Sequence, residues 1–216
     1  MAGPCFQGEG QPNIVFKTIR FILFLFVTME MWLLHHNLAK SSDFIRICIY
    51  FTTWGLIFTF ISIWLGTYIT FAKTSTKNKY SPFCAWKWYI FTYELAFIME
   101  IIITCVFWLL LYSSMKKKPL YANSEIQMLG LVLHHSLPLI LLVIDYTINA
   151  MPIVGRHIYM ICFMCAAYLM LNYYVTIKRG TPVYGIMSWD SPKALMIPVG
   201  TVLAGLIIFS ILTIIN

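Results

Sequence analysis

The sequence contains few charged residues. Of its 216 residues, 8 are Asp or Glu and 15 are Lys or Arg, so charged side chains make up 11% of the chain, whereas hydrophobic ones make up 60%. Soluble domains are usually about half apolar and about a quarter charged. This shortage of charge excludes an ordinary soluble fold and favours a protein that lies in a membrane.

The chain also lacks any long polar segment, internal repeat or low-complexity tract. A helix needs roughly 20 mostly apolar residues to cross the hydrocarbon of a bilayer. Six stretches reach that length, and breakers and basic residues separate them. The expected spans are 14–36, 44–72, 88–113, 126–148, 157–177 and 194–215. The sequence therefore predicts one all-α integral membrane domain over residues 1–216, a bundle of six transmembrane helices with short loops.

The basic residues flank the predicted spans, and the chain has a net charge of +7. Short basic flanks are typical of contact with lipid headgroups, so we expect membrane lipids as partners and no nucleic acid. We call side B the membrane side that holds the loops after the first, third and fifth spans. Side B has eight basic residues and the other side has seven, so the positive-inside rule does not choose an orientation. The seven are Lys17, Arg20, Lys73, Lys77, Lys79, Lys87 and Arg156.

The six cysteines show no pattern of a disulfide framework, because four of them lie inside predicted spans. Cys162 and Cys165 have the spacing of a metal-binding or redox pair. A lone pair lacks the further ligands that a zinc site requires, whereas small residues are common at membrane helix interfaces. We therefore expect these cysteines to pack between helices, and we expect neither a metal nor another cofactor.

Polar residues inside four of the spans fall at similar depth below side B. The helical rise places Glu30, Thr52, His135 and Asn172 between roughly 8 and 13 Å from that side. Ionisable groups within a membrane usually face the bundle interior or a wet cavity. A hydroxyl and an imidazole at matching depth are the two groups that nucleophile–base chemistry needs. The layer therefore predicts a site that contains Thr52 and His135.

Each of these residues also has a structural interpretation. A threonine in a membrane helix commonly bonds to a carbonyl of its own helix, and a lone histidine commonly joins two helices. His134 lies about 100° around the helix from His135, so the two cannot face the same cleft. Pro138 frees a carbonyl one turn earlier and is expected to kink the fourth span.

Four stretches resemble one family of membrane proteins. The stretch IYFTTWG (49–55) resembles the threonine motif of the rolling stone and androgen-induced protein family, and HSLPLILLVID (135–145) resembles its histidine motif. MPIVGRHIY (151–159) and GTPVYGIMSWDSP (180–192) are similar to its next two landmarks, in the same order. The family has a rolling stone branch, which is linked to cell fusion, and an androgen-induced branch. The chain is more similar to the rolling stone branch.

The resemblance implies a six-span fold. In the androgen-induced branch it also implies a threonine-dependent hydrolase of fatty acid esters of hydroxy fatty acids. The nucleophile position falls on Thr52, or on Thr53 if the register shifts by one, and the catalytic histidine falls on His135. That branch has a second histidine three residues earlier, where this chain has Val132.

Two functions are therefore expected as alternatives. In the first, an intramembrane hydrolase of lipid esters, Thr52 attacks the ester and His135 takes its proton. Glu30 or Asn172 then orients the imidazole or stabilises the oxyanion. A hydrolase needs the Thr52 hydroxyl within hydrogen-bond reach of His135 and a lipid-sized cavity beside the pair.

The second function is a non-catalytic accessory or structural subunit of a larger membrane complex, in which the same pair is packed shut. For the hydrolase, the loop RGTPVYGIMSWDSP (179–192) is the expected cap, with Tyr184 and Trp189 at the interface. The expected location is an endomembrane or the plasma membrane, with the mitochondrial inner membrane as the alternative.

Overall fold

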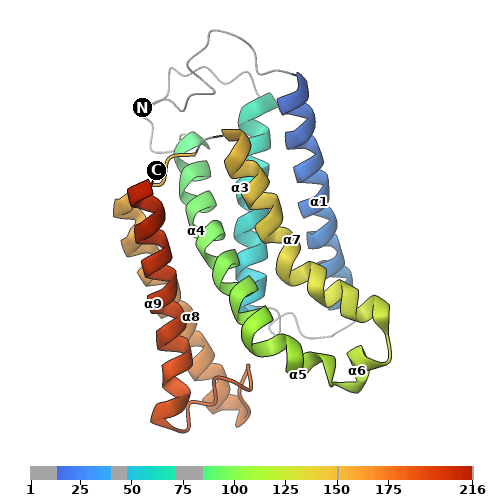
Figure 1. Cartoon of the computed structure of the whole chain (residues 1–216), viewed down its shortest axis with the longest axis vertical. Helices are drawn as coiled ribbons and strands as arrows, with labels where there is room; N and C mark the ends of the chain where they lie inside the picture. The colour runs from blue at the N-terminus through green and yellow to red at the C-terminus, as the bar shows by residue number, and fades with distance from the viewer. Residues whose placement is uncertain (1–13, 40–47, 72–84, 150, 216) are drawn as a thin grey trace.

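The computed structural model of the chain describes residues 14–39, 48–71, 85–149 and 151–215. All regular structure in these residues is helical. The long helices are α1 (Ile14–Ala39), α3 (Phe51–Phe71), α4 (Ala85–Val106), α7 (Glu125–Asn149), α8 (Ile158–Arg179) and α9 (Pro192–Ile215). They alternate in direction along the bundle, and the short helices α5 (Tyr112–Lys116) and α6 (Pro119–Ala122) lie at one end of it (Figure 1). That end corresponds to side B.

Five helical segments are long and apolar enough to cross a membrane, which indicates an integral, multi-pass membrane protein. They cover 51–71, 85–116, 125–149, 155–179 and 194–215, so they match the second to sixth predicted spans. The first predicted span, 14–36, is helical as α1 but is not among these five. Helix α3 begins at Phe51, later than the predicted start at 44; of that predicted span, 44–47 and 72 lie outside the described residues.

Helix α4 is the centre of the bundle. One of its faces packs with α1, α3 and α7 in a core that includes Val27, Ile63 and Leu142. Its other face packs with α8 and α9, around residues such as Ile161 and Phe209. Large apolar side chains remain exposed on the outer faces of the other helices. Such surfaces suit a lipid environment, in which exposed hydrocarbon has no cost.

A buried ion pair joins three helices on the α1 side of the core. Arg20 Nη1 of α1 lies 2.6 Å from Asp145 Oδ1 of α7. The hydroxyl of Tyr89 on α4 accepts a hydrogen bond from Arg20 Nη2 at 2.5 Å and donates one to Asp145 Oδ2 at 2.6 Å. Buried charges are tolerated when they are paired in this way. The sequence predicts Arg20 to be one of the cations that flank the membrane, but its side chain is buried, at 2% exposed.

Two further carboxylates of α4 have partners within the bundle. Glu94 accepts a hydrogen bond from the backbone N–H of Val154 at 2.5 Å and pairs with His157. Glu100 accepts one from the Thr59 hydroxyl of α3 at 3.5 Å. These contacts connect α4 to α3 and to the segment before α8, which fixes the frame around the site described next.

Candidate functional site

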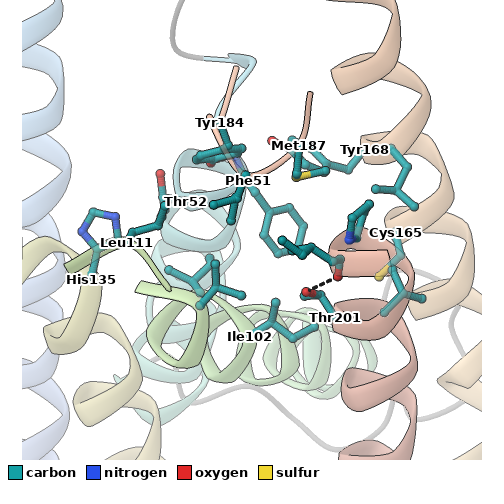
Figure 2. A pocket seen from close by; sticks show the side chains of 17 residues that line it. Phe51, Thr52, Ile102, Leu111, His135, Cys165, Tyr168, Tyr184, Met187 and Thr201 are labelled. Atoms are coloured by element: carbon teal, nitrogen blue, oxygen red, sulfur yellow. Dashed lines mark hydrogen bonds between the residues drawn. The ribbon is translucent and has the colours of Figure 1, made fainter. Parts of the chain in front are cut away.

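A mostly apolar pocket lies between α3, α4, α8, α9 and the 180–191 segment (Figure 2). The space between its walls is about 670 Å³, including the part open to the surroundings. The wall is formed by Phe51, Thr52, Ile102, Ile103, Val106, Leu111, His135, Cys165, Tyr168, Leu169, Tyr184, Ile186, Met187, Ile197, Pro198, Thr201 and Val202. Thr52 and His135 therefore border the same cavity.

The Thr52 hydroxyl differs from those of most other helical threonines. Seven of them donate a hydrogen bond to the carbonyl four residues earlier: Thr18, Thr28, Thr67, Thr70, Thr92, Thr201 and Thr213. Thr52 is the second residue of α3, and the carbonyl four residues before it, Cys48 O, accepts the Trp54 indole N–H at 2.7 Å. Within the described residues, the Thr52 hydroxyl has no hydrogen-bond partner, so it is available to a ligand in the pocket.

The His135 ring is held in one orientation. It is 9% exposed and stacks on Phe107, with ring centroids 4.2 Å apart. Its Nδ1 lies 2.9 Å from the Leu131 carbonyl oxygen. A neutral imidazole that donates through Nδ1 keeps its lone pair on Nε2. His135 thus has the tautomer that a general base requires.

The backbone around His135 is irregular, and α4 braces it. Pro138 lies inside α7 and cannot bond to the carbonyl one turn earlier. Opposite it, α4 passes into the π-helical segment η3 (Phe107–Leu111). Segments of π-helix are rare in proteins, and those that occur are often found at functional sites. The Thr104 hydroxyl donates to the His135 carbonyl at 2.8 Å, and the Trp108 indole donates to the Ser136 hydroxyl at 3.1 Å.

Thr52 and His135 share the pocket wall without touching through a hydrogen bond. No such bond joins these two residues, both of which the structure describes. In the view of Figure 2, Leu111 lies between the two side chains. A cavity borders both residues, but the direct contact expected between hydroxyl and imidazole is not made in this conformation.

Glu30 contacts His134 and not His135. Its Oε2 lies 3.5 Å from His134 Nδ1, and the His134 ring lies edge-on to the His135 ring at 5.5 Å. Any effect of Glu30 on His135 therefore passes through His134. The two histidines face different neighbours, as their helical spacing predicts.

Asn172 holds the cap of the pocket. Its Oδ1 accepts a hydrogen bond from the Trp189 indole at 2.7 Å, and its Nδ2 donates to the Tyr168 hydroxyl at 3.2 Å. Trp189 adopts a left-handed backbone conformation, with φ of 60°. This conformation is costly for a residue with a bulky side chain. The amide of Asn172 thus anchors the strained 180–191 segment and does not orient His135.

Tyr184 connects this segment to the start of α3. Its hydroxyl oxygen accepts a hydrogen bond from the backbone N–H of Phe51 at 3.0 Å. Burial raises the pKa of the Tyr184 hydroxyl above its ordinary value, so the group is neutral at physiological pH. Thr53 is 3% exposed and is not part of the pocket wall. Of the two adjacent threonines, the structure therefore presents Thr52 to the cavity.

Phe107 and Tyr168 are parts of the site that the sequence patterns do not predict. Tyr168 donates a hydrogen bond to the Ile49 carbonyl at 3.1 Å and lies one helical turn before Asn172. That spacing is the only sequence signal for its role. Phe107 has none, because its contact with His135 depends on how α4 packs against α7.

Among the described residues, no three His, Cys, Asp or Glu side chains gather as they would around a metal ion. The chain matches no protein-family model, and no curated protein and no solved structure gives a significant match.

Proposed function

We propose that the chain is a six-span intramembrane hydrolase of lipid esters, with Thr52 as nucleophile and His135 as general base. The observation that carries this proposal is that an unpartnered hydroxyl and a histidine with a free Nε2 border one apolar cavity. The resemblance of residues 49–55 and 135–145 to the threonine and histidine motifs of the androgen-induced proteins supports the same pair. It also favours α1 as the sixth span.

The reaction follows the usual course of acyl transfer. The Thr52 oxygen attacks the ester carbonyl, and His135 Nε2 accepts the hydroxyl proton. The tetrahedral intermediate then breaks its bond to the alcohol, which leaves with the proton from His135. Water, deprotonated by His135, hydrolyses the acyl-threonine and regenerates the hydroxyl. Atoms and protons balance over the two steps without a cofactor.

The separation of Thr52 from His135 requires the two side chains to approach each other when substrate is bound. Catalytic hydrogen bonds are often long in free enzymes and tighten in the substrate complex. Leu111 belongs to η3, and Pro138 interrupts the hydrogen bonding of α7 beside His135. These irregular helices are the elements that we expect to adjust.

The test is ester hydrolysis by the full chain in lipid nanodiscs, with fatty acid esters of hydroxy fatty acids as substrate. We expect Thr52→Val and His135→Gln each to reduce kcat/KM by at least about 100-fold, as the loss of an acid–base or nucleophilic group does. Thr70→Val is the matched control, because the Thr70 hydroxyl bonds within its own helix at 2.7 Å. Release of the fatty acid product, measured by mass spectrometry, provides the rate.

Hydrolysis that persists at the wild-type rate in Thr52→Val would overturn the assignment of the nucleophile. The absence of hydrolysis in the wild-type protein, together with tight lipid binding, would indicate the non-catalytic alternative, in which the chain is a lipid-binding or accessory subunit of a membrane complex.

A further inference from the structure

We infer that the pocket takes one unbranched acyl chain end-on, and that Ile102 limits the length of chain it accepts. The assignment of the ester end to Thr52 rests on the proposed function, whereas the position of the methyl end rests on the pocket alone.

The wall of the pocket changes in polarity along its length. The polar groups with free capacity, the Thr52 hydroxyl and His135 Nε2, belong to the part near side B, where Tyr184 also lies. Ile102, Cys165 and Val202 are the wall residues of α4, α8 and α9 that lie farthest along each helix from that end. The hydroxyl of Thr201 bonds to the Ile197 carbonyl at 2.7 Å and so adds no free polar group at the far end. An acyl chain with one polar end and one apolar end therefore fits the pocket in one direction only.

The depth of the pocket matches one leaflet. On the α4 side, the wall runs from Leu111 at the side B end to Ile102. At the helical rise, this separation of nine residues corresponds to about 14 Å. The hydrocarbon core of a bilayer is roughly 30 Å thick, so the length of this wall is similar to the thickness of one leaflet.

Ile102 closes the far end because α4 and α9 approach closely there. A Cβ built at Gly205 of α9 would lie 2.5 Å from Ile102 Cδ1 and 3.3 Å from Ile102 Cγ1. The Ile102 side chain therefore occupies the space that a larger residue at 205 would fill. It is 7% exposed, and it belongs both to the core between α4 and α9 and to the pocket wall. Shortening Ile102 should lengthen the pocket.

The test measures binding of saturated fatty acids of increasing chain length to the full protein in nanodiscs, by competition with a photo-crosslinkable fatty acid. The measurements are made on Thr52→Val, so that turnover cannot alter the result. While added carbons remain in the pocket, each should improve affinity about fourfold, the equivalent of about 0.8 kcal/mol per methylene. Affinity should stop rising at the length that reaches Ile102.

We expect Ile102→Ala to move this plateau to longer chains and Val202→Phe to move it to shorter ones. Ile98→Ala is the matched control: Ile98 lies one turn earlier on α4, 3.7 Å from the Cβ position at Gly205, and is not on the pocket wall. It should leave the plateau unchanged. Melting temperatures of all variants establish which of them fold. If Ile102→Ala does not fold, Val202→Phe tests the inference independently.

In the Thr52→Val background, an identical plateau with and without Ile102→Ala, or an equal shift in Ile98→Ala, would overturn the role of Ile102. Affinity that does not depend on chain length would overturn the end-on acyl site. Because binding is measured without turnover, these failures are distinct from a failure of the hydrolase proposal, which would appear as hydrolysis that does not depend on Thr52.

Discussion

The role of a polar residue in this bundle depends on which groups its neighbours leave available. Thr201 and Thr52 both line the pocket, yet the Thr201 hydroxyl is bonded to its own helix and the Thr52 hydroxyl is not. Thr52 is the second residue of α3, so the residue four positions earlier, Cys48, lies before this helix, and its carbonyl accepts the Trp54 indole N–H. Residue type and depth predicted Thr52 and His135 as candidates. They could not predict this arrangement, which depends on the conformation of residues 48–50.

The buried ion pair between Arg20 and Asp145 is expected to contribute to the stability of the protein. We expect Arg20→Ala to lower the free energy of unfolding by about 3–5 kcal/mol, because it leaves the buried Asp145 carboxylate without its cation. Unfolding of the purified protein in detergent, followed by thermal or denaturant titration, measures the change.

Lys17→Ala is the control for Arg20, since Lys17 lies one turn earlier on α1 and is only partly buried. A similar loss of stability in both variants would show that the ion pair has no special contribution. The sequence contained both charges of this pair, but their separation along the chain concealed the contact.

At the scale of the helices, glycines decide how closely the elements pack. A Cβ at Gly66 of α3 would overlap the Arg20 guanidinium and would lie 2.9 Å from Tyr89 Cε2. Gly130 of α7, in contrast, has no atom within 4 Å of such a Cβ. The same substitution should therefore have opposite effects at the two positions.

We expect Gly66→Ala to destabilise the protein by about 1–3 kcal/mol through overpacking. Gly130→Ala should stabilise it by up to about 1 kcal/mol, because alanine is the better helix former. Melting curves in the same detergent compare the two. Stabilisation by both substitutions would mean that α1 and α3 can separate to admit the methyl group.

The helices themselves were predicted well, and their ends less well. Apolar length alone located five of the segments that can span a membrane, since bilayer thickness imposes that length. The start of α3 was placed at 44, and the helix begins at Phe51, where the Tyr184 hydroxyl accepts the first backbone N–H. That partner comes from a loop far along the chain, which no local pattern of residues 44–51 reveals.

For the whole molecule, the topology depends on whether α1 crosses the membrane with the five candidate spans. Its Arg20 is paired inside the bundle, which reduces the cost of placing this helix in hydrocarbon. Six spans put both termini on one side, whereas five put them on opposite sides. We expect epitope tags at the two ends to be equally accessible to protease in sealed membrane vesicles.

A tag inserted between Lys118 and Pro119, in the connection from α5 to α6, should show the opposite accessibility and serves as the internal control. Termini with different protection would contradict the six-span topology and would leave α1 on the membrane surface or beside the bundle.

The sequence by itself determined that the chain is helical and that its helices are long and apolar enough to cross a membrane. These properties follow from composition and from the length that a bilayer demands, and both are local. Only the tertiary structure decided that Thr52 and not Thr53 borders the cavity, that Glu30 faces His134, and that Asn172 holds the cap. Helix rotation and interhelical packing control those contacts, and both depend on residues distant in the chain.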